Sequence, residues 1–518
     1  MNTTKKQTPS LAELDSRTFD VVVVGGGIIG AATAREAAKA GYSVLLAEKS
    51  DFATGATSRS SRLLHCGLRY FETPKPFRTF AKHPGHLLVA LRMARQAMQC
   101  RYEFVKSAPE RVTGIEMLFP IYKNSHYLPW QIDLGFSLLS RMAPRDVPLN
   151  YRRLNRDKAL AHPMCANLAN KENLHSVAIF TEYQLVWPER ICIDAILDAE
   201  ELGAVALNYT NASIGQMDGD TRSVFLDQAN GETAEVTGRR VMVMAGYWID
   251  RILFKANPDT PPKSFGTKGA HIVIQLPENL RGIGMATVNS RGEPFYCIPQ
   301  GDLHYIGPTE TVYDGDPDTI CCNEDDLIFL LEESRELFPG FNLGREDVIR
   351  TWAGVRPLTF DKDFPKGKRS RELHDLSTAG LSGVFAMTSA PIMTHRDAAR
   401  EVVSKLKEKI APSGAPKQIE CQPHLPKENS TSPYLLQSKK ACHLADVRTA
   451  VREEHSRHMD DVLYRRIGIG WRHFFTEDEL APIAEVMAEE LNWTPEQKAI
   501  EISKFQEEVK ELFGVPKP

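Results

Sequence analysis

Six residues near the beginning of the chain have the spacing of a turn that binds the diphosphate of a dinucleotide. Residues 25–30 read Gly-Gly-Gly-Ile-Ile-Gly, follow the apolar run 19–24 and open an alanine-rich stretch. This order predicts a buried strand, a turn and a helix that stops at Gly41. In such a turn Gly25 permits the tight bend, Gly27 lets backbone N–H groups approach a diphosphate, and Gly30 lets the helix pack closely on the strand.

An acidic residue follows at the distance expected of a ribose ligand, about 20 residues after the turn. The second apolar run, 43–47, ends at Glu48. A carboxylate there accepts hydrogen bonds from ribose hydroxyls and disfavours a 2'-phosphate. The pattern therefore predicts a cofactor with an ADP moiety, but it does not distinguish NAD from FAD. A glycine-rich turn without a ligand is the structural alternative.

Composition limits the classes of protein to which the chain can belong. It has 518 residues, 42% hydrophobic and 25% charged, which is typical of a globular protein. The net charge of -4, from 63 Lys and Arg against 67 Asp and Glu, gives no basic footprint for nucleic acid. The nine cysteines lack paired Cys-x-x-Cys spacing. We therefore expect neither a disulfide framework nor a metal site.

Hydropathy gives no sign of export or of a membrane span. Residues 1–16 are polar, and no run of about 18 apolar residues occurs. We therefore expect a cytoplasmic protein. Peripheral attachment to the inner face of the cell membrane is left open, because basic residues between Arg62 and Arg111 could attract an anionic surface, although a solvated exterior is the preferred interpretation.

The remaining pattern predicts an α/β enzyme of two lobes with an appended helical domain. After a polar tail (1–17), the unit 18–411 divides into a dinucleotide-binding lobe (18–75, 174–262 and 350–411) and a substrate lobe (76–173 and 263–349). Short strands predicted at 271–275, 295–298 and 304–306 suit an antiparallel substrate-facing sheet. A linker rich in Pro and Ser (412–435) precedes the domain 436–518, where helices are predicted at 447–468, 476–491 and 494–513.

Several motifs, in order along the chain, carry a resemblance to a known family. Residues 57–70 read Thr-Ser-Arg-Ser-Ser-Arg-Leu-Leu-His-Cys-Gly-Leu-Arg-Tyr, which resembles the segment after the second strand of FAD-dependent glycerol-3-phosphate dehydrogenases. The likeness spans roughly residues 18–510 and includes the helical domain. Its other motifs are Ala245-Gly246, Lys268-Gly269-Ala270-His271, Ile306-Gly307-Pro308-Thr309-Glu310 and Gly354-Val355-Arg356-Pro357.

The resemblance implies an FAD cofactor and a fold. The fold is α/β, with a Rossmann-type FAD-binding domain like those of glutathione reductase and D-amino-acid oxidase, an antiparallel-sheet substrate domain and a C-terminal all-α cap. Thr57, Ser58 and Ser61 would run along the flavin diphosphate. The implied cofactor-binding residues are Gly25, Gly26, Gly27, Gly30, Glu48, Thr57, Ser58, Ser61, Ala245, Gly246, Ser389 and Ala390.

The resemblance also implies the oxidation of the secondary alcohol of a small anionic polyol to a ketone, by hydride transfer to flavin N5. Glycerol 3-phosphate, giving dihydroxyacetone phosphate, is the leading substrate. His271 is the candidate base, because imidazole titrates near neutrality. Arg356 is the candidate cation that stabilises a developing alkoxide. Glu310 would assist the proton relay or orient a neighbouring histidine. The implied substrate-binding residues are Arg69, Tyr70, His271, Arg356 and His395.

One departure from the family pattern bears on the substrate. Where family members have Gly-Gly-Lys, this chain has Ser389-Ala390-Pro391, and proline cannot supply the cation that holds a phosphate. Loss of a charge-assisted hydrogen bond costs about 1.5 to 3 kcal/mol unless another cation, such as His395 or Arg59, replaces it. A larger polyol phosphate, such as a tetritol phosphate, or a three-carbon polyol with another anionic head is therefore the alternative substrate.

Other assignments stay open at this point. An amine or amino-acid oxidase shares the flavin domain, and a flavin-binding protein without turnover is the non-enzymatic alternative. The electron acceptor is a quinone or oxygen, and the sequence does not decide between them. It also does not distinguish a homodimer from a monomer, or covalent from non-covalent FAD. Cys66, which replaces a family glycine, is interpreted as a packing residue, and Tyr247 and Trp248 as core or interface residues.

Overall fold

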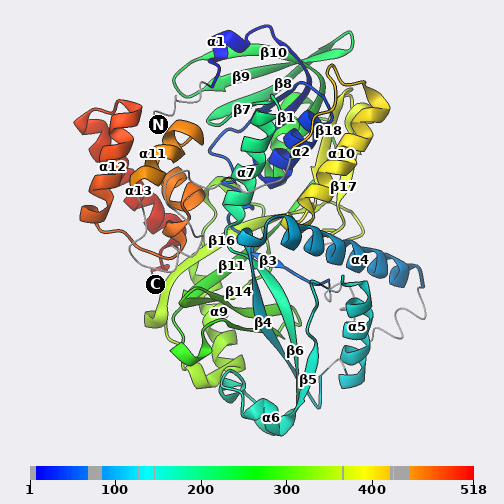
Figure 1. Cartoon of the computed structure of the whole chain (residues 1–518), viewed down its shortest axis with the longest axis vertical. Helices are drawn as coiled ribbons and strands as arrows, with labels where there is room; N and C mark the ends of the chain where they lie inside the picture. Colours follow the sequence, from blue (N-terminus) through cyan, green and yellow to red (C-terminus); the bar gives the residue numbers. More distant parts are fainter. Residues whose placement is uncertain are drawn as a thin grey trace.

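The computed structural model describes residues 8–67, 84–125, 128–144, 146–364, 367–419, 424 and 444–517. In these residues, two large sheets lie one above the other, and a group of helices near the C-terminus lies beside them (Figure 1). The upper sheet, sheet A, runs in the order β17-β18-β10-β1-β2-β7, with β8 and β9 added beside β10. The lower sheet, sheet B, runs β15-β11-β14-β13-β12-β4-β6-β3, with β16 beside β11 and β5 beside β6.

The centre of sheet A is parallel, which places the ends of its strands at one edge. Strand β1 (Thr18–Val24) pairs in parallel with β2 (Val44–Ala47) and β10 (Thr233–Val243), and β10 pairs in parallel with β18 (Val384–Thr388). Strands β2 and β18 are buried throughout, β1 is buried except at Thr18, and β10 is buried at its C-terminal end, as the apolar composition of these segments predicts. The outer strands are β7 (Val205–Leu207), β8 (Thr210–Asp218), β9 (Thr221–Gln228) and β17 (Glu372–Asp375).

Helices cover one face of sheet A. Helix α2 (Ile28–Lys39) packs between α7 (Pro188–Glu201) and α10 (His395–Lys409). The other face packs against α8 (Ile249–Ala256) and α1 (Leu11–Leu14), whose two leucines are buried although the sequence predicts a polar tail there. The described part of the expected linker continues along α2, where Gly414 N donates to Gly41 O at 2.9 Å.

Sheet B is antiparallel throughout except between β4 and β12. It contains three strands that the sequence assigns to the other lobe. Strand β16 (Val348–Thr359) pairs with β11 (Ser264–Ile274) along its whole length, β6 (Leu174–Leu185) pairs with β4 (Val112–Tyr122), and the short β3 (Leu63–Leu64) pairs with β6. The remaining strands are β5 (Arg152–Asn155), β12 (Ile283–Val288), β13 (Pro294–Gln300), β14 (Leu303–Gly307) and β15 (Thr311–Val312).

The C-terminal helices form the cap, the name used here for residues 444–517. Helices α12 (Glu477–Leu491) and α13 (Pro495–Phe513) begin at Thr476 and Thr494, as the sequence predicts, and both have a capping box. The single helix expected over 447–468 is wrong. Helix α11 (Leu444–Glu453) ends early, the backbone turns at His455 (φ +62°), and a π-helical turn, η13 (Asp461–Arg466), follows.

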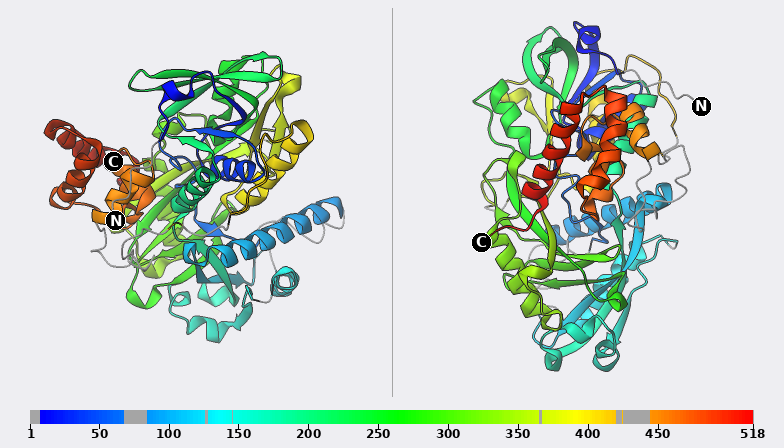
Figure 2. Two further views of the ribbon diagram at one scale, coloured as in Figure 1. Left: turned by 45° about the horizontal axis from the view of Figure 1, so that its top comes forward. Right: turned by 90° about the vertical axis from the view of Figure 1, so that its left-hand side faces the viewer.

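Three helices project from or flank sheet B: α4 (Pro84–Ser107), α5 (Pro129–Met142) and α9 (Glu324–Leu337). Figure 2 shows α4 extending away from the body of the molecule. Within the described residues, no helix is both long enough and apolar enough to cross a bilayer.

Candidate active site

The glycine turn has the geometry that its spacing predicts. Gly25 adopts φ +109°, and a β-carbon there would lie 2.9 Å from Ala245 Cα. A β-carbon on Gly30 would lie 1.8 Å from Gly25 O, so a side chain is excluded. Gly27 is the N-cap of α2 and has no side chain to cap the helix. The first turn of α2 therefore presents backbone N–H groups to an anion at the edge of sheet A.

Two predicted residues complete this edge. Both oxygens of Glu48 accept backbone hydrogen bonds, from Gly26 N at 2.6 Å and Ser50 N at 2.9 Å. Burial raises the pKa of Glu48, and these two hydrogen bonds oppose that rise. On the other side of the turn, Gly246 follows β10 with φ +56°, which brings the Ala245-Gly246 turn against Gly25.

A hydroxyl-rich segment connects the glycine turn with sheet B. Thr57 Oγ1 accepts from Ile28 N at 3.1 Å, at the start of α2. Ser58 Oγ donates to the carbonyl of Gly55 at 3.2 Å, within its own turn. Ser61 Oγ lies 3.2 Å from His271 Nε2. One short segment therefore contacts both the predicted cofactor turn and the predicted base.

His271 is enclosed by aromatic rings. Its side chain is 2% exposed, its ring stacks on Trp352 with centroids 4.8 Å apart, and it meets the edge of Tyr305. Burial, and then the charges of Arg356 and Arg62, lower the pKa of His271 to about 3. In the free protein its pKa therefore lies below the near-neutral range of an exposed imidazole, because burial disfavours the charged form. The role of His271 as the base stays a prediction.

Arg356 lies on the same side of sheet B. Its strand is paired with that of His271, and its guanidinium donates to the carbonyls of Lys268 at 3.2 Å and Thr309 at 3.1 Å. The side chains of the same two residues, Lys268 and Thr309, bind a buried carboxylate, Asp326. Asp326 Oδ2 lies 2.5 Å from Lys268 Nζ, and Asp326 Oδ1 accepts from Thr309 Oγ1 at 3.1 Å.

The Ser389-Ala390-Pro391 loop approaches Arg356 through the backbone. Ser389 adopts φ +52°, a left-handed conformation that suits the glycine of the family pattern. Its N–H donates to Pro357 O at 2.9 Å, and its hydroxyl donates to Lys368 O at 3.1 Å. Ala390 is half-buried and Pro391 is exposed.

Two other predicted residues lie in different surroundings. Glu310 forms an ion pair with Arg369, so its carboxylate does not orient a histidine in this structure. His395 caps its own turn, with Nδ1 2.7 Å from Ile392 O, and lines a polar cavity with Arg35 and Asp198 between the helices that cover sheet A. Burial lowers the pKa of His395 to about 3 in the free protein.

Among the remaining residues that the sequence singles out, Arg69 and Tyr70 lie outside the described residues. Arg59 is half-buried and donates to Ile320 O at 2.8 Å. Cys66 is 1% exposed within the apolar core, which agrees with a packing role. Tyr247 donates to Tyr313 O at 2.8 Å, and Trp248 to Asp318 at 3.1 Å; both therefore contact the segment after β15, which agrees with an interface role.

Comparison with known proteins decides the family. A family model described as FAD dependent oxidoreductase matches residues 20–395, and one described as the C-terminal domain of alpha-glycerophosphate oxidase matches 421–498. The chain belongs to the FAD-dependent oxidoreductase family. Its cofactor is FAD, and the model of the second domain confirms the resemblance of the cap that the sequence indicates.

Relatives of this oxidoreductase extend over most of its length. A glycerol-3-phosphate dehydrogenase of Synechocystis sp. is 26% identical over 96% of this chain and 97% of its own. An aerobic glycerol-3-phosphate dehydrogenase of Staphylococcus haemolyticus is 29% identical over 77% of this chain and 68% of its own. The fold resembles the FAD complex of the Bacillus halodurans glycerol-3-phosphate dehydrogenase, with a TM-score of 0.71, 21% identity and coverage of 97% of this chain and 96% of that one.

The residues of this oxidoreductase fit FAD. Gly27, at the start of α2, leaves the space in front of the helix open, because the atom nearest to a β-carbon there would be Thr57 Oγ1 at 3.4 Å. Glu48 keeps lone pairs for ribose hydroxyls beyond the two hydrogen bonds that it accepts. The turn, Glu48 and Thr57 would hold the ADP part, and the segment towards Ser61 leads to His271 and Arg356.

Sequence reasoning missed two residues that shape this site. Trp352 stacks on His271, and Asp326 binds the side chains of Lys268 and Thr309, whose backbone carbonyls accept from Arg356. A signal for Asp326 exists, because Asn323 and Asp326 have the spacing of a helix capping box. That signal locates the start of α9 but does not indicate which strand the helix supports.

Proposed function

We propose that this oxidoreductase oxidises the secondary hydroxyl of a small anionic polyol to a ketone, with glycerol 3-phosphate as the first candidate. The observation that carries the proposal is the placement of a fixed cation, Arg356, and a neutral imidazole, His271, on paired strands of sheet B. The names of the relatives over nearly the full chain support the same substrate. When bound, FAD supplies the acceptor for the hydride.

The two side chains have complementary roles in this proposal. The guanidinium of Arg356 binds the substrate oxygen and stabilises its negative charge as the proton leaves. His271 takes that proton at Nε2, the nitrogen that lies beside the Ser61 hydroxyl. An anionic substrate raises the affinity of the imidazole for a proton, which offsets the lowered pKa of His271 in the free protein. The aromatic rings around His271 exclude water from this transfer.

The contacts of the substrate's anionic head depart from the family pattern because Pro391 replaces the family lysine. His395 lies against Ile392 O in the cavity with Arg35 and Asp198, and Arg59 donates to Ile320 O, so neither contact supports a direct replacement. Arg69, outside the described residues, remains our proposed phosphate ligand together with Tyr70. We therefore include tetritol phosphates and three-carbon polyols with other anionic heads among the substrates to be tested.

An anaerobic reduction assay tests the proposal. The FAD-loaded protein is mixed with glycerol 3-phosphate, a tetritol phosphate, glycerol and a panel of amino acids, and the oxidised-flavin absorbance is followed. We expect glycerol 3-phosphate to bleach the flavin and to yield dihydroxyacetone phosphate. Bleaching by an amino acid with release of ammonia would favour the amino-acid oxidase alternative, whose fold the glycine oxidase of Geobacillus kaustophilus shares at a TM-score of 0.55. Bleaching by none of these compounds would favour a protein without turnover.

We propose a membrane quinone, rather than oxygen, as the electron acceptor. Exposed apolar side chains on α4 and at the start of α5 support contact with a membrane. Leu88 on α4 is 66% exposed and Trp130 on α5 is 50% exposed, and Val89, Leu128 and Leu134 are also exposed. Sedimentation with anionic vesicles tests the contact, and Leu88→Ser with Trp130→Ser should weaken it. Peroxide formed in proportion to ketone, with no effect of added quinone, would point to oxygen.

A further inference from the structure

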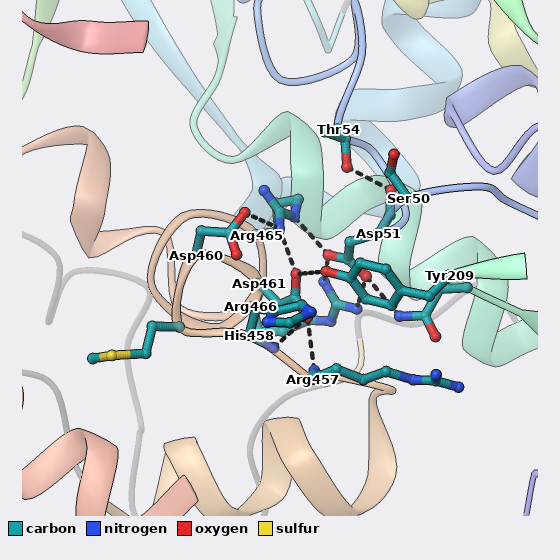
Figure 3. Close-up of polar contacts among 12 residues, drawn as sticks. Ser50, Asp51, Thr54, Tyr209, Arg457, His458, Asp460, Asp461, Arg465 and Arg466 are labelled. Carbon is teal, nitrogen blue, oxygen red and sulfur yellow. Dashed lines mark hydrogen bonds and ion pairs between the residues drawn. The ribbon is translucent and has the colours of Figure 1, made fainter. Parts of the chain in front are cut away.

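The segment from Ser50 to Arg62 carries the hydroxyl residues Thr57, Ser58 and Ser61, and the cap contacts it at both ends. At the first end, Asp51 accepts hydrogen bonds from two neighbouring arginines of η13 (Figure 3). Arg466 binds it through both terminal nitrogens, at 2.6 and 2.7 Å, and Arg465 donates from Nε at 2.5 Å. A fourth bond comes from Asn208 Nδ2 at 2.9 Å.

This carboxylate is fully enclosed. The side chains of Asp51 and Arg466 are both 0% exposed, and Arg465 and Arg466 hold the pKa of Asp51 well below its usual range. A buried carboxylate without its cations is strongly disfavoured. If the cap were displaced, Asp51 would have to move towards water and would carry its neighbours with it.

Those neighbours form part of the cofactor turn. Phe52 lies against Gly26, where a β-carbon would come within 2.6 Å of Phe52 Cδ1. Ala53 N donates to Gly26 O at 3.1 Å, and Ala53 adopts φ +66°. Gly26 N in turn donates to Glu48. A displacement at Asp51 is therefore transmitted directly to the turn that binds the diphosphate.

The second end of the segment is held by aromatic residues of the cap. The guanidinium of Arg62 lies 4.4 Å from the ring centroid of Trp471, while its Nη2 binds Glu189 of α7 at 2.9 Å. Arg59 lies 5.8 Å from the ring of Phe513, at the end of α13. The cap therefore contacts both ends of the segment that carries the hydroxyl residues Thr57, Ser58 and Ser61.

We propose that Arg465 and Arg466 are positioning residues for FAD, and that the cap organises the cofactor-binding segment through Asp51. The proposal rests on FAD as the cofactor and is independent of the substrate. It gives the C-terminal domain a role in cofactor binding, although Arg465 and Arg466 lie more than 400 residues from Asp51 along the chain.

The affinity of the apoprotein for FAD tests this role, measured by quenching of flavin fluorescence. We expect Arg466→Met to raise the Kd for FAD by about tenfold or more, which corresponds to about 1.4 kcal/mol per tenfold change. Arg466→Lys should have a smaller effect because it keeps a charge, and Asp51→Asn combined with Arg466→Met should recover part of the loss. The control is Glu454→Gln, which weakens a different contact across the same interface, with Arg190 of α7.

Hydrogen exchange of the FAD-saturated protein gives a readout that does not depend on activity. In Arg466→Met, residues 50–62 should exchange faster than in the wild type, and in Glu454→Gln they should exchange as in the wild type. Equal Kd values for the Arg466 and Glu454 variants, or faster exchange confined to the cap, would overturn the proposal. If Arg466→Met does not fold, Arg466→Lys and Asp51→Asn decide, and an unchanged Kd in both would overturn it.

Discussion

The guanidinium of Arg356 lies against the backbone of Gly269, where a β-carbon would come within 2.3 Å of Nη2. The two residues stand on paired strands, β16 and β11, and the absence of a side chain at 269 gives the guanidinium its path across the strand. In the Lys-Gly-Ala-His motif, Gly269 therefore leaves room for the guanidinium of Arg356, and the same motif supplies His271, the candidate base.

Gly269→Ala should slow flavin reduction by displacing Arg356. A misplacement of about 1 Å at a reacting centre can cost about a hundredfold in rate, and we expect a loss of about that size, with FAD affinity unchanged. Arg356→Ala should lose at least as much, because it removes the cation altogether. The measurement is the anaerobic rate of bleaching by glycerol 3-phosphate.

Gly114→Ala is the matched control in the same sheet. A β-carbon at Gly114 would meet its nearest neighbour at an ordinary 3.6 Å, so its rate should remain that of the wild type. A rate for Gly269→Ala equal to that of Gly114→Ala would contradict the proposed role of the Arg356 position.

The second prediction concerns the pH dependence of the reaction. Because the pKa of His271 is lowered to about 3, its imidazole stays neutral in the free protein at every pH from 5 to 8. The value of kcat/KM should therefore show no ionisation of His271 near its ordinary pKa of about 6.5. His271→Gln should lower the rate by about a hundredfold or more, which is typical for a lost general base. An inflection near pH 6.5 that disappears in His271→Gln would contradict the lowered pKa.

The shape of the glycine turn could be predicted from the sequence because it is local. The glycines lie within a single strand-helix-strand unit, Glu48 directly follows it, and short-range sterics determine the turn. The surroundings of Arg356 were harder to predict, because the sequence pattern of a strand does not determine which sheet it joins. Residues 350–411 were assigned to the dinucleotide-binding lobe, whereas β16 pairs with β11 of sheet B.

Long-range charge pairs were beyond prediction for a similar reason. Asp51 and Arg466 are each ordinary charged residues in the sequence, and only the docked cap reveals that both are buried. The same charges explain the wrong helix at 447–468. Glu454 forms an ion pair with Arg190, and Arg466 forms one with Asp51. These ion pairs favour a π-helical turn over one continuous helix.

The third prediction concerns acid stability. Burial lowers the pKa of His304 to about 4, so the folded protein disfavours its protonated form. The unfolded chain binds this proton below about pH 6.5, and stability is therefore lost as the pH falls from about 6.5 towards 4. The maximum slope is about 1.4 kcal/mol per pH unit for one group. His304→Gln should reduce the slope of the unfolding free energy against pH over that range, measured by urea denaturation. An unchanged slope would show that His304 does not contribute.

The fourth prediction contrasts two substitutions of Ser389. The left-handed backbone at position 389 lowers the unfolding free energy by about 1 kcal/mol for any residue with a side chain. The hydrogen bond from the Ser389 hydroxyl to Lys368 O raises it by about the same amount. Ser389→Gly loses the bond but also the strain, so its unfolding free energy should change little. Ser389→Ala loses only the bond and should be destabilised by about 1 kcal/mol. Equal destabilisation of the two variants would argue against the strained backbone.

The last prediction concerns Asp326, which links the support of the site to its stability. This carboxylate binds Lys268 and Thr309, and the backbone carbonyls of those two residues accept the hydrogen bonds of Arg356. Asp326→Ala leaves the buried ammonium of Lys268 without its partner, which should cost about 3 to 5 kcal/mol of unfolding free energy. In Asp326→Ala with Lys268→Met the unpaired charge is absent, so most of that stability should return. Flavin reduction should stay slower than in the wild type in the double variant, because the Thr309 hydroxyl still lacks its acceptor, which leaves Thr309 held by its two hydrogen bonds with Ala270. A double variant that recovers both stability and rate would show that Asp326 acts on the fold alone and does not position Arg356.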